Sequence, residues 1–392
     1  MGRGFHHPSG RVIALGRLLL ATLLLLAILI DVSQPAKAPA VTYALLGGYV
    51  VFAAALVIAT WSNWWQEARL AGPAHAIDIL VFMLLVFVTE GYTSPYFIFF
   101  VFVLLSAAIR WGWRETTLTA ILMTLLYLGT GLFAADKQLD FDAPRFIVRT
   151  AQLVIVSLIL VWFGANQWRA RFFIHSEELL PEPSLDKSPL ETALAAAMKD
   201  VGAKQGALVW RDSERKNARA IAIRDGEMRD VKLKRRVLDG AGSTPFLYDM
   251  ARHRGLGRDD DRNLRPLDPA EAIGAETAAA VKPREGLALP LDLDKGDGLM
   301  FLEQVPNLST DHIDLAEQIA ADVSAHIQRH ALLKAVEDNA EARSRLVLAR
   351  DLHDSVVQFL AGAAFRLEAM KRSEAAGGSL QQDLNELKQL MM

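Results

Sequence analysis

The chain has 392 residues, of which 52% are hydrophobic and 22% charged, and its formal net charge is −3. This small negative charge gives no general attraction to nucleic acid, and the lack of cysteine excludes disulfides, thiol switches and iron–sulfur clusters within the chain. Hydrophobic residues dominate positions 1–170, whereas charged residues are mixed into the remainder. The sequence therefore predicts one part in a membrane and another in water.

Six apolar runs in the first part are predicted to be membrane spans. Their approximate bounds are 12–32, 41–61, 76–90, 95–110, 115–135 and 146–166. A bilayer core needs roughly 20 residues of helix, and the third and fourth runs are the shortest. Residues 1–170 are therefore expected to form an all-α domain of six spans, followed by a linker at 171–189.

Basic residues gather at alternate ends of these runs, which predicts that those ends face the cytoplasm. They include Arg11, Arg17, Arg69, Arg110, Arg114, Arg169 and Arg171. We expect a multi-pass protein of the bacterial inner (cytoplasmic) membrane, with its N-terminus and soluble domains in the cytoplasm. His75 and Asp78, at the inner end of the third run, are interpreted as solvated interfacial residues rather than as a proton relay.

The region after the linker mixes helical and strand-like segments, which predicts an α+β domain over residues 190–312. The expected elements are a helix at 190–201, strands at 206–211 and 218–223, a helix at 245–254, a polar loop at 255–265, strands at 285–293 and 298–305, and a long helix from about residue 310. The basic run Lys232 to Arg236 is expected at a solvated sheet edge or in a patch that faces the membrane, so no direct binding of nucleic acid is predicted.

Four histidines of this region do not have the spacing of a metal site, so no metal is predicted. They are His253, His312, His326 and His330. His326 and His330 lie four residues apart on the long helix and are expected to be exposed.

The long helix carries apolar residues at three- and four-residue spacing, which predicts a parallel two-stranded coiled coil over 313–345. The same stripe continues through Ala349, Leu352, Val356, Leu360, Ala363, Leu367 and Met370. Gly377 and Gly378 are expected to end this helix, and a second helix is predicted at 380–392. Two such hairpins from two chains would make a four-helix bundle over 346–392.

His353, Asp354 and Gln358 form the most informative group on this helix. A neutral imidazole can attack a γ-phosphoryl group when its other nitrogen shares a proton with a carboxylate, so His353 is the candidate phosphoacceptor and Asp354 the general base. The order His353-Asp354-Ser355-Val356-Val357-Gln358 resembles the His-Asp/Glu-x-x-x-Gln motif of sensor histidine kinases paired with NarL-type response regulators. The resemblance implies that Gln358 positions water for dephosphorylation of the regulator.

This resemblance implies a homodimer, phosphotransfer to a NarL-type regulator, and ATP with Mg²⁺ held by a nucleotide-binding domain that follows the histidine. Asp294 to Gly298 matches the Asp-x-Gly-x-Gly pattern of that domain, but it precedes His353 between two strands and is predicted to be a hairpin turn. The chain is therefore expected to be truncated before the ATP-binding domain or encoded in two parts, which makes its autonomous kinase activity doubtful. Residues 190–312 resemble a GAF domain in the order of their elements.

The connection from Glu90 to Phe97 resembles a short loop of multi-span sensor kinases, including the quinone-responsive type. One interpretation is a lipid-soluble ligand held by Glu90, Tyr92, Ser94 and Pro95. The simpler interpretation is a turn between two helices at the membrane surface, and we favour it.

Two other functions remain open from the sequence. The chain could be a catalytically silent membrane receptor that dimerises with intact kinases and modulates them. It could also be a small transporter with a regulatory domain, although the predicted spans suggest no buried charge network and the motif at His353 would then have no purpose.

Overall fold

The computed structural model describes residues 8–30, 38–89, 94–136, 142–173, 188–212, 217–224, 226–239, 242–259, 263–293, 296–375, 384–385 and 388. The chain divides into two compact units, Met1–Ile327 and Gln328–Met392.

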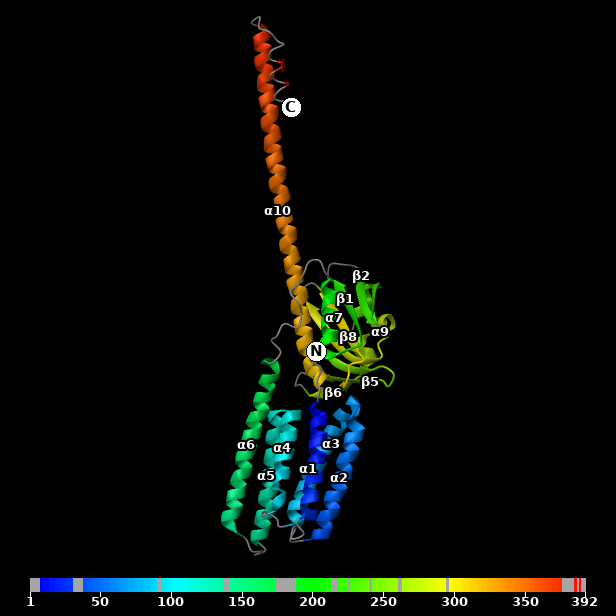
Figure 1. The fold of residues 1–392 in the computed structure, drawn as a ribbon, viewed down its shortest axis with the longest axis vertical. Helices are drawn as coiled ribbons and strands as arrows, with labels where there is room; N and C mark the ends of the chain where they lie inside the picture. The colour runs from blue at the N-terminus through cyan, green and yellow to red at the C-terminus, as the bar shows by residue number, and fades with distance from the viewer. Residues whose placement is uncertain are drawn as a thin grey trace. The chain divides into compact units, whose positions relative to one another are not determined.

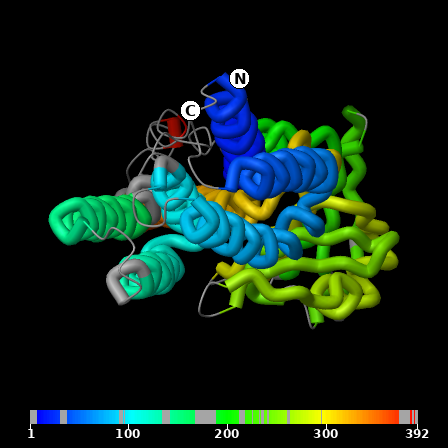
Figure 2. Tube along the Cα trace, turned by 90° about the horizontal axis from the view of Figure 1, so that it is seen from below, coloured from blue at the N-terminus to red at the C-terminus, as the bar shows by residue number. Residues whose placement is uncertain are grey.

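Helices lie side by side in the apolar first part of the chain (Figures 1 and 2). They are α1 (Ser9–Ile30), α2 (Pro39–Thr60), α3 (Trp64–Val88), α4 (Ile98–Arg110), α5 (Trp113–Asp136) and α6 (Ala143–Phe173), with a 3-10 turn, η2 (Pro95–Phe97), before α4. Aromatic side chains fill the space between them: Phe82, Phe99, Phe100 and Tyr127 are almost fully buried. Apolar residues elsewhere on these helices face outward, as expected for helices surrounded by lipid.

Five of these helices are long and apolar enough to cross a membrane, which supports five of the six predicted spans. The exception is α4, whose 13 residues extend about 20 Å, less than the roughly 30 Å of a hydrocarbon core. The third span was predicted to start near residue 76, but α3 begins at Trp64 and contains Pro73. Arg69 therefore lies within a helix and not in a connection.

A single eight-stranded antiparallel sheet forms the centre of the soluble region. Its strands are β1 (Gln205–Asp212), β2 (Asn217–Arg224), β3 (Glu227–Lys234), β4 (Phe246–Asp249), β5 (Arg254–Arg258), β6 (Leu264–Leu267), β7 (Glu285–Leu293) and β8 (Gly296–Glu303), in the spatial order β3-β2-β1-β8-β7-β4-β5-β6. The hairpin turn predicted at Asp294 to Gly298 is consistent with the pairing of Leu293 with Gly296. The basic run from Lys232 begins on β3, which is an edge strand as expected.

Helices cover both faces of this sheet. They are α7 (Pro189–Val201), α8 (Pro269–Ile273), α9 (Ala275–Val281), the 3-10 helix η3 (Arg235–Leu238) and the first turns of α10 (Asp311–Ala375). Because side chains alternate along a strand, Leu208 packs against α7 and α10, whereas Val209 packs against η3, α8 and α9. The domain thus has two apolar cores.

The predicted helix at 245–254 and the predicted loop at 255–265 are wrong, because β4, β5 and the first half of β6 lie within these residues. Phe246, Leu247 and Tyr248 are all buried, since both faces of the sheet are covered. Such a strand shows no alternation of apolar and polar residues, so its sequence is ambiguous with a buried helix. On β5, a Cβ at Gly255 or Gly257 would lie 2.4 and 2.9 Å from the Leu267 side chain of β6, which explains the two glycines.

The last described helix, α10, runs without a break for 65 residues and begins where the long helix was predicted. Its residues from Gln328 onward belong to the second compact unit. Gly377, Gly378 and most of the predicted second helix lie outside the described residues, and the coiled coil stays a prediction.

Candidate functional site

His353 and Asp354 lie on α10 with their side chains in solvent. The side chains are 75% and 67% exposed, and 3.7 Å separates Nδ1 of His353 from Oδ1 of Asp354. This distance is longer than a hydrogen bond, but a small rotation of the exposed carboxylate would close it. Because Asp354 is close to Nδ1, the other ring nitrogen, Nε2, is left free to meet a phosphoryl group.

Gln358 lies one helical turn beyond Asp354 and is also exposed. Successive residues of an α-helix are turned by about 100°, which places Asp354 and Gln358 on the side of α10 opposite the apolar stripe. His353 lies between that polar side and the stripe. The helix therefore presents a reactive side to solvent and an apolar side to another helix.

Most of the apolar stripe of α10 is exposed to solvent, and only Ala363 and Met370 are partly covered by the residues that the structure describes. Leu352, Val356 and Leu360 are each more than half exposed. A helix with this much exposed apolar surface needs a partner helix to remove it from water.

The candidate ligand residues near the membrane surface are described in part. Glu90 and Tyr92 lie outside the described residues, and Pro95 begins η2. Ser94 is buried: its hydroxyl lies 2.9 Å from that of Thr89 and accepts the N–H of Tyr96, and its carbonyl accepts a bond of 2.8 Å from Arg149 on α6. These bonds within the protein account for Ser94 without a ligand, so the ligand site stays a prediction.

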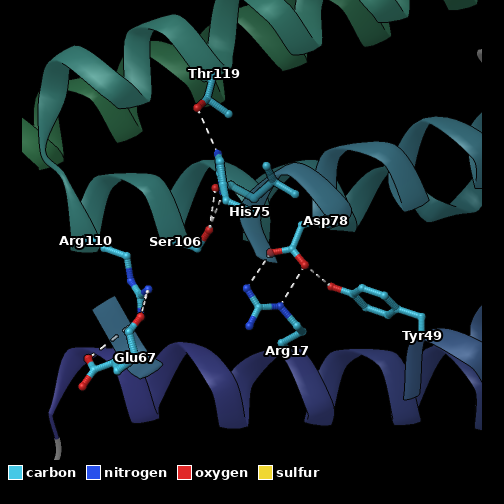
Figure 3. A network of polar contacts seen from close by, with 9 residues as sticks. Arg17, Tyr49, Glu67, His75, Asp78, Ser106, Arg110 and Thr119 are labelled. Carbon is cyan, nitrogen blue, oxygen red and sulfur yellow. Dashed lines mark hydrogen bonds and ion pairs between the residues drawn. The ribbon is translucent and has the colours of Figure 1, made fainter. Parts of the chain in front are cut away.

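The interpretation of Asp78 as a solvated residue is wrong, as is the suggestion that the spans contain no buried charges, whereas His75 is half-buried. Asp78 is fully buried and accepts two bonds from Arg17 of α1, at 2.8 and 2.7 Å, and one of 2.7 Å from the hydroxyl of Tyr49 on α2 (Figure 3). The reason is that Arg17 and Asp78 neutralise each other inside the bundle, so neither needs the aqueous boundary.

Polar contacts extend from α3 to two further helices. His75 lies 3.1 Å from the hydroxyl of Thr119 on α5 and 3.4 Å from that of Ser106 on α4 (Figure 3). A second pair joins the buried Glu67 of α3 to the partly buried Arg110 of α4 at 4.0 Å. The signal in the sequence was the presence of Arg17 and Asp78 inside apolar runs, which is costly unless each has a partner.

Among the histidines of the soluble region, His312 and His326 are buried, so the expected exposure of His326 is wrong. His312 accepts bonds at Nδ1 from the backbone and hydroxyl of Ser309, at 3.2 and 3.0 Å. Burial lowers the pKa of His312, although the charge of Asp311 acts in the opposite direction. No group of three or more histidines and carboxylates in the described ranges is placed to hold a metal ion.

The comparison with protein families matches residues 343–392 to HisKA_3, a histidine kinase family, and this segment includes His353, Asp354 and Gln358. Residues 343–392 are thus a dimerisation and phosphoacceptor domain of the two-component type. The comparison with curated proteins found no match.

Solved structures similar to this chain include a phycoerythrobilin-bound GAF domain from a cyanobacterial phytochrome, at 14% identity and a TM-score of 0.27, covering 43% of this chain and 93% of that one. Residues of a methyl-accepting chemotaxis protein match at 16% identity and a TM-score of 0.25, covering 38% and 93%. A phycocyanobilin-bound GAF domain, also from a cyanobacterial phytochrome, matches at 12% identity and a TM-score of 0.27, covering 43% and 93%. Scores this low carry no conclusion about ligand or function.

Proposed function

We propose that this chain is a membrane sensor histidine kinase of a two-component system, in which His353 receives a phosphoryl group and passes it to a NarL-type response regulator. The HisKA_3 match over residues 343–392 is the observation that carries the proposal. The long apolar helices support a place in the membrane, and we infer the bacterial inner membrane with the soluble domains in the cytoplasm.

The proposed chemistry uses the side of α10 that faces solvent. Nε2 of His353 attacks the γ-phosphorus of ATP, the bond from phosphorus to the bridging oxygen of ADP breaks, and Asp354 takes the proton that leaves Nδ1. The separation of 3.7 Å between Nδ1 and Asp354 would shorten in the complex with nucleotide, as is common for catalytic hydrogen bonds. A nucleotide-binding domain would present ATP and Mg²⁺ to His353.

Return of the system to its resting state requires hydrolysis of the phosphorylated regulator. Gln358 is exposed one turn from Asp354, where its amide could orient a water molecule toward the phosphoryl group of a docked regulator. His353 and Gln358 would then serve opposite reactions on the same helix.

We further propose that two chains associate through α10. The exposed stripe formed by Leu352, Val356 and Leu360 supports this proposal, because a second copy would bury it in a helical bundle. The sheet domain would lie in the path of the signal as a GAF-like relay.

The alternative function, a silent receptor that dimerises with intact kinases, differs in one respect: His353 would never carry phosphate. The test is to reconstitute the chain in vesicles and measure acid-labile phosphate from labelled ATP, with and without a separately expressed nucleotide-binding domain of a histidine kinase. Label on the native chain and none on His353→Gln would support the kinase. No label on either chain with the domain present would favour the silent receptor.

A further inference from the structure

The ion pair between Arg17 and Asp78 is unusual for a bundle of apolar membrane helices, because it buries two charges. The side chains of Arg17 and Asp78 are only 7% and 0% exposed, and the guanidinium meets the carboxylate through two parallel bonds. Burying two charges costs several kcal/mol in general, and an apolar pair of similar volume is often at least as stable. Stability alone therefore does not explain the pair.

Asp78 connects three helices at one point. Its carboxylate accepts from Arg17 on α1 and from the hydroxyl of Tyr49 on α2, while Asp78 itself belongs to α3 (Figure 3). The directions of these bonds are fixed by the planar guanidinium and the carboxylate, so α1 cannot slide along α3 without breaking them. Apolar side chains would permit such sliding.

The remaining polar residues of α3 extend this connection. His75, one turn before Asp78, contacts Ser106 and Thr119, and Glu67 pairs with Arg110. Ser106 donates its proton to the carbonyl of Val103 at 2.8 Å, so its oxygen can accept Nδ1–H of a neutral His75, and in that tautomer Nε2 can accept from the Thr119 hydroxyl. A neutral imidazole thus satisfies both contacts without adding a charge.

A cavity of about 20 Å³ lies between the two ion pairs, lined by Arg17, Glu67 and Arg110 among others. This volume suits one water molecule and not a lipid-soluble ligand. Pro73 of α3 lies between Glu67 and His75, and a proline inside a helix removes one backbone hydrogen bond. Helix α3 can therefore bend at Pro73, between the polar residues Glu67 and His75.

Helix α1 connects this network to the start of α10. Ser9, at the beginning of α1, donates its backbone N–H and its hydroxyl to the two carboxylate oxygens of Asp311, at 2.6 and 2.7 Å. Asp311 is the first residue of α10, and Ser9 and Asp311 belong to the same compact unit. A shift of α1 at Arg17 would thus move a contact at the start of the helix that carries His353.

We infer that Arg17 and Asp78 are positioning residues of the sensor: their ion pair, with Tyr49, fixes α1 against α3 and so sets the packing of α10 in the dimer and the phosphorylation of His353. This inference rests on the proposed kinase function. It predicts that an apolar replacement of the pair changes the packing of α10 and the phosphorylation of His353 even when the protein stays folded in the membrane.

The lack of native cysteine allows a direct test on the whole chain in membrane vesicles. Leu333→Cys and Val336→Cys place single cysteines at exposed positions of α10. The ratio of the crosslinking yields at the two positions reports how the α10 helices of two chains pack against each other. The tested changes are Tyr49→Phe, which removes one hydrogen bond, Asp78→Asn, and the apolar double variant Arg17→Met with Asp78→Leu. Arg145→Met is the matched control, because it breaks an exposed pair with Asp142 on the same membrane part.

We expect the apolar double variant to reach native levels in the membrane and to change the crosslinking ratio about fivefold or more, with a parallel change in His353 phosphorylation. Tyr49→Phe should shift the ratio in the same direction by less, and Arg145→Met should leave it native. A native ratio in the apolar double variant would overturn the inference, as would an equal shift in Arg145→Met. If Asp78→Asn does not accumulate, the double variant and Tyr49→Phe decide the question.

The outcomes separate this inference from the proposed function. Crosslinking needs no phosphoryl transfer, so a native chain that crosslinks but never carries phosphate counts against the kinase. If the native chain is phosphorylated but the crosslinking ratio does not change when the ion pair is replaced, the result counts against the inference alone.

Discussion

Asp354 and Gln358 are close in space but are proposed to serve opposite reactions, and this can be tested residue by residue. Asp354→Ala removes the base, so we expect His353 phosphorylation to fall about a hundredfold, within the range typical for general-base catalysis. Gln358→Ala should leave that rate within about twofold and slow dephosphorylation of the regulator about tenfold or more. Phosphate on the chain and on the regulator would be followed separately.

Ser355→Ala is the control for this pair of variants, because Ser355 is exposed on the same turns of α10 and has no proposed role. Equal loss of both activities in Gln358→Ala would contradict the division of roles.

His312 makes the stability of the sheet domain depend on pH. Its imidazole is fully buried, and burial lowers its pKa from the ordinary value near 6.5. Between the lowered pKa and about 6.5 the unfolded chain binds more protons than the folded one, so the free energy of unfolding rises with pH through this window. We expect stability to be complete above about pH 7 and to decline on acidification below about 6.5.

Urea unfolding of the reconstituted chain at a series of pH values, followed by tryptophan fluorescence, would measure this slope. His312→Gln keeps a polar side chain but cannot titrate, so its curve should be flatter over the same window. His253→Gln is the control, because His253 lies on an exposed turn. An unchanged slope in His312→Gln would show that other groups cause the dependence.

The site on α10 could be predicted at the residue scale because its three members lie within six positions of the sequence, where helical geometry fixes their relation. The network around Asp78 could not, because Arg17 and Asp78 are 61 positions apart and the pairing depends on how three helices pack. Charges in membrane spans are costly, so the sequence shows that Arg17 and Asp78 each need a partner, but it does not show which residue that partner is.

At the scale of elements, the exposed stripe of α10 predicts a dimer whose strength depends on individual apolar residues. Leu360→Asp should weaken dimerisation by about 2 kcal/mol per copy, or roughly a thousandfold for a dimer in which both copies carry it, because a buried leucine contributes about that much. The association of labelled chains in detergent, followed by energy transfer during dilution, would measure the change.

Ala361→Asp is the matched control, since it adds the same charge one residue further along, on a different side of the helix. Equal weakening by both substitutions would indicate that charge on α10, and not the stripe, controls association.

Elements with clear periodicity were predicted well. The short apolar runs of β1, β2, β7 and β8, and the three- and four-residue spacing of α7 and α10, led to nearly correct bounds. β4 was missed because it has only four residues and is buried on both faces, which makes it ambiguous with part of a buried helix, and β5 because its glycines suggest a loop. Those glycines are there for the approach of Leu267, a contact that no local pattern reveals.

At the scale of the whole molecule, the segregation of apolar and charged residues was enough to predict a membrane part and a soluble part. Composition could not decide whether α4 crosses the bilayer. Phe99, Phe100, Val103 and Leu104 of this helix are fully buried among its neighbours. A helix surrounded by protein need not match the hydrocarbon thickness, so its short length does not exclude a crossing.

We predict that α4 does cross, giving six spans with both ends in the cytoplasm, and single cysteines in the cysteine-free chain can test this. Ser62→Cys and Trp113→Cys flank α3 and α4 and should be shielded from an impermeant maleimide in intact cells, whereas Ala143→Cys, at the start of α6, should react. If α4 does not cross, Trp113→Cys would react and Ala143→Cys would be shielded. Val336→Cys on α10 would then also react, placing His353 outside the cell and away from ATP, which would contradict the proposed kinase as well as the six spans.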